Sequence, residues 1–443
     1  MKIIGLDKLQ NKDLKNAITK TLKQNIANNL YQTSEFAIVQ NPSGVYPKFE
    51  IYPLAQAKIP LKKICAILTD MDGTTTTTET LCLYSLAEMI RLITNHNIEK
   101  LDQKKDYPNI IGNSTTKHVE YLINKYQEDI DTKEFIKKYI EAVLWTVKNS
   151  ADQKRKNEVI ANSKNTGTYQ ILENIIGQDI SKFKNPKSII IKCLKNMGKI
   201  NLNRFEYKVK AAIDIYYANY HQILKQISNG KSQELSTKLT AGKALIKPMN
   251  YISTFLPLIK GVLGEEAEYF GKNSEEKSVL KRLGKYFQDN PVKIGLVTSS
   301  IFYEADIVLT EIFRKINSDI KHWNVSSKVK QKALKIFSSY NSFYDVVVTA
   351  DDSHEIRLKP HRDLYSIALY KLGIPQKEFK YVIGFEDSES GTIAIRAAGV
   401  GLSIGLPFDD TKGHNLAAAK HIMKNGLYEF VHKHRFLLES LLG

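Results

Sequence analysis

The chain is 443 residues long, and its 64 basic and 47 acidic residues give a formal net charge of +17. That length exceeds one ordinary hydrophobic core, so we expect two domains. No apolar run reaches the roughly 18 residues that span a bilayer, and the first apolar segment is too short for a signal peptide. The three cysteines are scattered, without the spacing of a metal site. We therefore expect a cytoplasmic protein with no membrane partner.

The positive charge is spread along the chain. Lysines alternate with acidic residues and fall on polar helix faces, for example at Lys133, Lys137 and Lys208. A nucleic-acid-binding protein would gather such residues in one stripe or patch. We therefore expect no nucleic-acid partner and interpret the charge first as a general bias of composition toward lysine and asparagine. The next possibility is a positive field that attracts phosphorylated metabolites. Nothing in the pattern indicates an oligomeric state.

An N-terminal extension precedes the first strongly apolar strand. Helical spacing runs over residues 9–30, and short strands are predicted at 36–39 and 49–52 around a turn. Residues 66–70 then form an apolar run with β character that ends in carboxylates. Over 81–289 apolar residues mostly recur at three and four, which predicts a largely helical region.

Strands and helices alternate in the last third of the chain, and alternation of this kind builds a parallel, doubly wound sheet. The predicted strands are 292–297, 344–348, 381–385 and 400–404. The strand at 66–70 must join the same sheet, so the helical region is an insertion after the first strand of the core. We predict a Rossmann-like α/β core with a large inserted α-helical cap. The predicted parts are the extension at 1–60, the core at 61–80 and 290–443, and the cap at 81–289.

Two carboxylates end the first predicted strand of the core, in the order Asp70, Met71, Asp72, Gly73. Alternate residues of a strand face the same way, and the glycine lets the chain turn at once. Both acids then lie at the carboxyl end of the strand, where open α/β sheets place their sites. Acids this close repel each other unless a cation or a shared proton relieves them. The alternative interpretation is an acidic turn after a buried strand.

Polar residues also follow two later strands. Thr298, Ser299 and Ser300 come directly after an apolar run, and their hydroxyl and N–H groups could hold phosphate oxygens. Glu386 and Asp387 follow the strand at 381–385, where two adjacent acids favour ligation of a hard cation. Each set has an ordinary alternative, which is a helix N-cap.

Lys359 precedes a predicted helix and, taken alone, would be a solvated surface lysine. Together with the three strand ends, and in this order along the chain, it resembles the motif set of the haloacid dehalogenase superfamily of phosphotransferases. The likeness is greatest to the branch that holds β-phosphoglucomutase and small phosphatases. It covers about residues 64–95 and 290–430. The resemblance implies Mg²⁺ as cofactor and a small phosphorylated metabolite, such as a sugar phosphate, as substrate.

The resemblance also implies a role for each matching residue. Asp70 corresponds to the nucleophile that becomes an aspartyl phosphate, and Asp72 corresponds to the general acid and base. Thr298 corresponds to the phosphate-binding hydroxyl, and Lys359 to the cation beside nucleophile and phosphate. The implied Mg²⁺ ligands are Asp70, the backbone carbonyl of Asp72, Glu386 and Asp387. Further substrate contacts are expected from Gly73, Ser299, Ser300 and Ser114.

Ser114 enters this set through a stretch of the predicted cap. Residues 111–115 stand ahead of a predicted helix at 117–126 and resemble the family's loop that reaches the substrate. A plain helix N-terminus is the alternative interpretation of this stretch. The insertion is far larger than the usual helical cap of this branch, so the extra helices are expected to close over the site, select the leaving group or form an interface.

The residues and the resemblance together predict a Mg²⁺-dependent phosphatase. It would hydrolyse a small phosphomonoester through an aspartyl phosphate on Asp70. One alternative is a phosphomutase, which uses the same residues and keeps its substrate while Asp70 carries the phosphoryl group. A second alternative, ranked below both, is a non-catalytic binding protein on a retained core. Loss of catalytic residues would mark that protein, and none is lost here.

Overall fold

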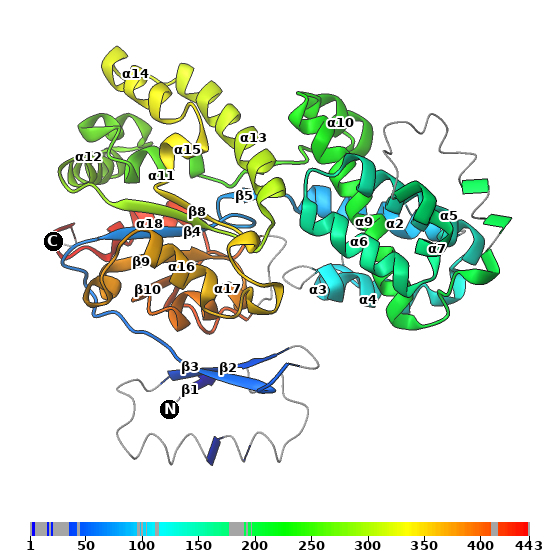
Figure 1. The fold of residues 1–443 in the computed structure, drawn as a ribbon. Helices are drawn as coiled ribbons and strands as arrows, with labels where there is room; N and C mark the ends of the chain where they lie inside the picture. The colour runs from blue at the N-terminus through cyan, green and yellow to red at the C-terminus, as the bar shows by residue number, and fades with distance from the viewer. Residues whose placement is uncertain are drawn as a thin grey trace. The chain divides into compact units, whose positions relative to one another are not determined.

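The computed structural model describes residues 2–4, 16, 19–20, 35–41, 45–94, 98, 101–102, 104–110, 115–176, 190–191, 194–195, 197–408 and 415–441. Contacts divide the chain into two compact units, Met1–Thr77 with Lys247–Gly443, and Thr78–Ile246. We call them the sheet unit and the helical unit (Figure 1). Among the residues described, no helix combines the length and the apolar character needed to cross a membrane.

The centre of the sheet unit is a six-stranded sheet in the order β11-β10-β9-β4-β7-β8 (Figure 1). Its strands are β4 (Ala66–Asp70), β7 (Lys293–Val297), β8 (Val346–Val348), β9 (Val382–Glu386), β10 (Leu402–Gly405) and β11 (His421–Ile422). Every neighbouring pair in this sheet is parallel. β4 and β9 are buried along their whole length, as strands are when helices cover both faces. The predicted doubly wound α/β core is confirmed.

Helices cover both faces of this sheet (Figure 1). α16 (Asp363–Lys371) and α17 (Glu389–Ala397) pack on the face that includes Ala66 and Leu68 of β4. On the other face, the ring of Phe385 in β9 contacts Phe255 of α11 (Ile252–Ile259) and Phe430 of α18 (Gly426–His432), with centroids 5.4 and 5.2 Å apart. Burying each phenyl ring contributes roughly 2–3 kcal/mol. Further helices of this unit are α12 (Ser274–Asp289), α13 (Phe302–Lys321), α14 (Ser327–Ile336) and α15 (Tyr340–Phe343).

The helical insertion ends earlier than expected. We placed its end at residue 289, but the chain rejoins the sheet unit at Lys247. A short antiparallel pair marks the return, between β5 (Thr76–Thr77) and β6 (Lys247–Pro248). α11 and α12 follow it and pack with the sheet unit, where the ring centroids of Phe287 and Phe436 lie 4.8 Å apart. Apolar spacing indicates these helices correctly, but spacing alone does not say on which core a helix packs.

The N-terminal extension forms a separate three-stranded sheet in the order β1-β2-β3. Its strands are β1 (Lys2–Ile4), β2 (Glu35–Gln40) and β3 (Phe49–Pro53), and most of the helix predicted at 9–30 lies outside the described residues. This sheet packs on α17 through a buried cluster of Ala37, Val39, Tyr52, Leu54, Ile393, Ala397 and Ala418. Arg396 of α17, 1% exposed, forms an ion pair with Glu35 and donates to the Ala55 carbonyl at 2.8 Å. The described part of the extension therefore covers a helix of the core, and its three strands stand outside the central sheet.

The helical unit holds the described helices between residues 78 and 246. They are α2 (Glu79–Ile93), α3 (Tyr107–Ile110), α4 (Thr115–Lys125), α5 (Thr132–Asn149), α6 (Gln153–Asn165), α7 (Thr168–Ile176), α9 (Phe205–Ser228) and α10 (Ser232–Thr240). Asp131 starts α5 by accepting hydrogen bonds from the N–H groups of Lys133 and Glu134. On α9, Tyr216 and Tyr220 are 4% and 7% exposed and stack at 5.7 Å, so they pack inside this unit.

Candidate active site

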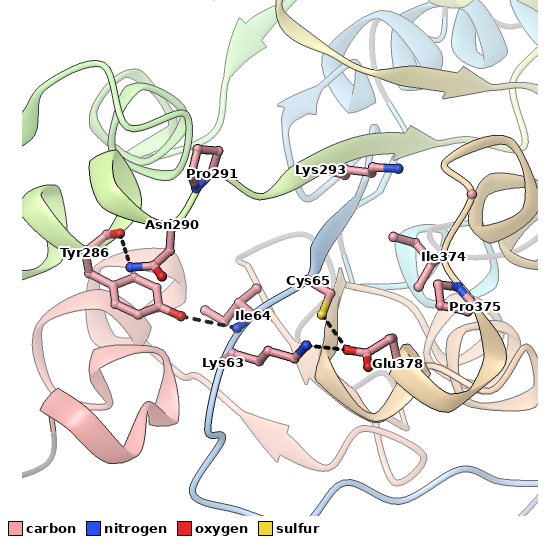
Figure 2. A pocket seen from close by; sticks show the side chains of 11 residues that line it. Lys63, Ile64, Cys65, Tyr286, Asn290, Pro291, Lys293, Ile374, Pro375 and Glu378 are labelled. Carbon is pink, nitrogen blue, oxygen red and sulfur yellow. Dashed lines mark hydrogen bonds and ion pairs between the residues drawn. The ribbon is translucent and has the colours of Figure 1, made fainter.

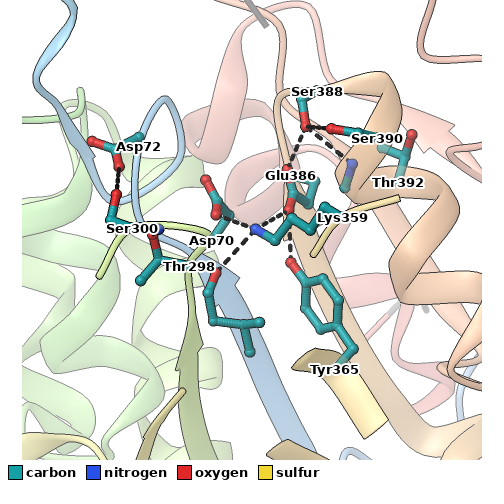
Figure 3. A network of polar contacts seen from close by, with 12 residues as sticks. Asp70, Asp72, Thr298, Ser300, Lys359, Tyr365, Glu386, Ser388, Ser390 and Thr392 are labelled. Carbon is teal, nitrogen blue, oxygen red and sulfur yellow. Dashed lines mark hydrogen bonds and ion pairs between the residues drawn. The ribbon is translucent and has the colours of Figure 1, made fainter. Parts of the chain in front are cut away.

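The strand register brings three strand ends together at one edge of the central sheet. Asp70 ends β4 and pairs with Val297, the last residue of β7, while Thr69 pairs with Phe385 of β9. Thr298 and Glu386 therefore flank Asp70 (Figure 3). Open parallel sheets place their ligand sites at this carboxyl edge.

Lys359 lies within this group, and its side chain is only 6% exposed. Its ammonium donates to Asp70 Oδ1, to Glu386 Oε1 at 2.6 Å and to the Val297 carbonyl oxygen at 3.1 Å (Figure 3). Burial alone would lower the pKa of Lys359, but the two carboxylates outweigh it and raise that pKa. The lysine is therefore a buried cation, and the surface alternative does not hold.

Three buried carboxylates converge beside this lysine. Oxygens of Asp70, Glu386 and Asp387 lie within 4.8 Å of one another. Burial, followed by the charge of Glu386, raises the pKa of Asp70 well above its usual value. Three carboxylates and one ammonium leave two negative charges when all four groups are ionised, which a divalent cation would balance. Oxygen donors are what Mg²⁺ prefers, so Asp70, Glu386 and Asp387 fit such an ion.

Glu386 is oriented by residues of two helices. Tyr365 of α16 donates to its Oε1 at 2.8 Å, and Ser388 donates to its Oε2 at 3.1 Å (Figure 3). Ser388 is also the N-cap of α17, since its hydroxyl accepts from the Gly391 N–H at 3.1 Å. The cap is thus Ser388, not Glu386 or Asp387, and both acids remain for the site. A Cβ on Gly391 would overlap the Glu386 carboxylate.

The turn after β4 fixes Asp70 and lets Asp387 come close. Gly73 has a φ of +84°, which favours glycine, and a Cβ there would overlap the Asp387 carboxylate. The Thr75 hydroxyl donates to the Asp70 carbonyl oxygen at 2.7 Å. The Asp72 carboxylate accepts from the Ser300 hydroxyl at 3.2 Å and lies beside it (Figure 3).

Asp72 differs from the other predicted ligands. Its carboxylate does not belong to the three-acid cluster found among the described residues. The expected ligand atom was its backbone carbonyl, and that assignment stays a prediction. A carboxylate outside the cluster, held by a hydroxyl, suits proton transfer better than metal ligation.

Thr298 is 1% exposed and does not cap a helix. α13 begins at Phe302 without a side-chain cap, and the Phe302 N–H donates instead to Asp351 at 2.8 Å. The Thr298 hydroxyl oxygen accepts from the Ser300 N–H at 3.0 Å. Its own proton can therefore be donated to an anion at the strand end.

Of the remaining predicted contacts, one is exposed and one is not described, and one residue of the site was not predicted. Ser299 is exposed at the same strand end, and Ser114 lies outside the described residues. Sequence reasoning overlooked Tyr365, because a tyrosine in an apolar helix is typical of core packing. Its place shortly after Lys359 is the one signal that could have pointed to it.

A pocket of about 480 Å³ lies at the opposite edge of the same sheet (Figure 2). Lys63, Cys65 and Lys293 line it near the starts of β4 and β7. The Cys65 thiol donates to Glu378 at 3.1 Å, and Lys63 pairs with the same carboxylate at 2.7 Å. Burial raises the pKa of Cys65 to about 11, so this thiol is protonated at neutral pH and is a poor nucleophile. The Cys65 thiol therefore offers no nucleophile at this pocket.

Comparisons with known proteins give distant structural likenesses. No protein-family model and no curated protein matches the chain. CbbY from Rhodobacter sphaeroides in complex with phosphate is 15% identical, with a TM-score of 0.39 over 82% of this chain and 98% of that one. A HAD family hydrolase from Deinococcus radiodurans R1 with bound phosphate and sodium is 13% identical, with a TM-score of 0.38 over 86% and 99%.

A β-phosphoglucomutase from Clostridium difficile is also similar. It is 16% identical, with a TM-score of 0.29 over 81% of this chain and 90% of that one. At such identities and TM-scores, functional conclusions rest on the residues of this chain alone.

Proposed function

We propose that this chain is a phosphotransferase of the haloacid dehalogenase type that hydrolyses a small phosphomonoester. One observation carries the proposal: Asp70, Lys359 and the Glu386–Asp387 pair converge, buried, at the carboxyl edge of a parallel sheet. Phosphoryl transfer needs a positioned nucleophile and positive charge around developing negative oxygens. A buried carboxylate beside a buried ammonium and a cation-compatible acid cluster supplies both.

The first half of the reaction would form an aspartyl phosphate. An oxygen of Asp70 attacks phosphorus, and the bond from phosphorus to the ester oxygen of the substrate breaks. Asp72 donates a proton to that departing oxygen, so the alcohol leaves neutral. Lys359 lowers the repulsion between the anionic nucleophile and the anionic phosphate, and the Thr298 hydroxyl donates to a phosphate oxygen.

The second half would return the enzyme to its starting state. Asp72 takes a proton from water, the water oxygen attacks phosphorus, and the bond between phosphorus and Asp70 breaks. Inorganic phosphate is released. Mg²⁺ held by Asp70, Glu386 and Asp387 would supply further compensation of the phosphate charge. A mutase would use the same residues, but it would return the phosphoryl group to the substrate.

The test is phosphate release from a panel of phosphorylated metabolites, with and without Mg²⁺. Asp70→Asn should lower kcat by about 10³-fold or more, because it removes the nucleophile while keeping the side-chain shape. Asp289→Asn, an exposed position on α12, is the matched control and should keep full activity. Asp72→Asn should slow both halves with an alkyl phosphate. With an aryl phosphate, whose leaving group needs no proton, only the second half should be slow, and intact-mass spectrometry should then detect phosphorylated protein. Undiminished turnover in Asp70→Asn would refute the assignment of the nucleophile.

A further inference from the structure

The loop that presents Lys359 to the acids also contacts the N-terminal extension. Residues 357–365 carry two inward contacts, from Lys359 to Asp70 and from Tyr365 to Glu386. The same nine-residue segment makes contacts to β3 through Arg357 and His361. These contacts link β3 of the extension to the site across about 300 residues of sequence.

Arg357 closes the loop and connects it to β3. Its Nε and one terminal nitrogen contact the two oxygens of Asp363 at 2.6 and 3.1 Å, so the loop is tied across Lys359. The other terminal nitrogen forms an ion pair with Glu50. Two-point contacts between arginine and a carboxylate fix orientation as well as distance. Arg357 therefore holds the start of the loop to its end and to the extension.

His361 makes the second link. It is 3% exposed, and its Nδ1 lies 2.9 Å from the Tyr52 hydroxyl. The same hydroxyl donates to Glu50 and lies 3.4 Å from a terminal nitrogen of Arg357. Tyr52 and Glu50 thus bind both flanks of Lys359, two residues before it and two residues after it.

The strand that carries these two side chains is itself well anchored. Tyr52 is 7% exposed in the cluster that packs β2 and β3 on α17. The Asn41 amide donates to Glu50 at 3.2 Å and to the Pro47 carbonyl at 2.7 Å. Burial opposes ionisation of Glu50, but hydrogen bonds from Tyr52, Asn41 and Arg357 outweigh it and lower its pKa, so it carries a full charge toward Arg357.

We propose that Glu50 and Tyr52 are positioning residues, through which the N-terminal extension holds the Lys359 loop against Asp70 and Glu386. The catalytic consequence rests on the proposed function, whereas the bracing of the loop does not. Misplacing a catalytic group by about 1 Å costs as much as 10²-fold in rate, so contacts that hold the Lys359 loop in place can affect turnover strongly. We call the contacts of Glu50 and Tyr52 with this loop the brace.

The test compares Tyr52→Phe with a matched control in the full-length protein. Tyr52→Phe keeps the buried ring and removes only the hydroxyl. Tyr340→Phe is the control, because Tyr340 is 3% exposed and donates its hydroxyl to Asp306, away from the loop. Hydrogen–deuterium exchange of peptides covering 357–365 should speed up by about tenfold in Tyr52→Phe and stay unchanged in Tyr340→Phe. Unchanged exchange in Tyr52→Phe would overturn the brace.

A second measurement distinguishes positioning of Lys359 from a general loosening of the loop at 357–365. Inorganic phosphate is titrated calorimetrically into wild type and Tyr52→Phe, each with Lys359 intact or changed to Met. If the brace acts through Lys359, Tyr52→Phe weakens phosphate binding by about fivefold with Lys359 present and not at all in Lys359→Met. An equal loss in both backgrounds would overturn positioning through Lys359.

The two results also separate this inference from the proposed function. In a wild type that releases phosphate from esters, Tyr52→Phe should lower kcat by about tenfold, and Glu50→Gln should do the same. A wild type that neither binds nor releases phosphate refutes the proposed function. In that case the hydrogen–deuterium exchange of peptides covering 357–365 alone tests whether Tyr52 holds the loop in place.

Discussion

The Glu386 carboxylate accepts hydrogen bonds from Lys359, Tyr365 and Ser388, and it faces Gly391. Each neighbour limits where the carboxylate can lie. The three donors compensate its charge, and the missing side chain at Gly391 leaves the space that it fills. At the scale of single residues, the position of the Glu386 carboxylate therefore depends both on its hydrogen-bond donors and on the absence of a side chain at Gly391.

Gly391→Ala tests that dependence on volume. The added methyl would overlap the Glu386 carboxylate and push it out of the acid cluster. We expect Mg²⁺ affinity to fall by about tenfold or more, and overpacking to cost roughly 1–3 kcal/mol of stability. Isothermal titration calorimetry with Mg²⁺ measures the first effect. Gly198→Ala is the control, because nothing lies within 4 Å of a Cβ built there, and equal losses in the two variants would contradict the steric explanation.

Some site residues were readable from the sequence and others were not. Asp70, Thr298 and Glu386 each end an apolar run, and parallel strands place such ends together. Lys359 has no such signal, and only the family resemblance indicated its place. The contact of Tyr52 with His361 could not be predicted, because it joins residues 309 positions apart.

At the scale of elements, α6 and α9 of the helical unit share a buried ion pair. Arg155 of α6 and Asp214 of α9 are 6% and 0% exposed, and the Asn162 amide donates to the same carboxylate at 3.2 Å. Removing one partner of a buried pair leaves an uncompensated charge. This ion pair thus joins the two helices, and breaking it should lower the free energy of unfolding substantially.

Arg155→Met should lower the free energy of unfolding by about 3 kcal/mol at pH 7, since Asp214 would be left buried without its cation. Urea denaturation measures the loss. Glu206→Gln breaks an exposed ion pair with Lys210 on the same helix and should leave the urea midpoint unchanged. A midpoint shift as large in Glu206→Gln as in Arg155→Met would contradict the role of burial.

The loss in Arg155→Met should also depend on pH. Burial outweighs the attraction of Arg155 and raises the pKa of Asp214 to about 6, above its usual value of 3.8. A carboxyl with a raised folded-state pKa is neutral below that value, so it depends less on a neighbouring cation there. The deficit of Arg155→Met should therefore shrink by roughly 1 kcal/mol from pH 7 to pH 5.5. A deficit that grows on acidification would refute this sign.

Elements were predicted better than their packing partners. The strands β4, β7 and β9 and the helix α9 follow from apolar runs and from spacing at three and four. The unit on which residues 247–289 pack could not be predicted, because helical spacing is the same whether a helix covers the sheet or joins the insertion. Phe287 packs with the sheet unit through a contact with Phe436, which lies far along the chain.

At the scale of the whole molecule, cation binding should add to stability. When they are ionised, three buried acids against one lysine leave surplus negative charge in the folded state, and a bound divalent ion would remove that repulsion. Mg²⁺ at about a hundred times its dissociation constant should stabilise the fold by about 2.7 kcal/mol. Thermal unfolding with Mg²⁺ or with EDTA measures this. Asp387→Asn should abolish the increase and Asp289→Asn should not, whereas an equal increase in both would contradict the assigned ligands.

The placement of β4 at the middle of the sheet has a consequence for synthesis of the protein. β4 ends at Asp70, but its neighbours begin only at Lys293 and Val382, after the whole helical unit has been made. A nascent chain therefore carries an unpaired apolar strand until late in translation, and such a strand is prone to aggregation until its neighbours pair with it. Asp70 lies early in the sequence, yet it gains its surroundings only when the last third of the chain has emerged from the ribosome.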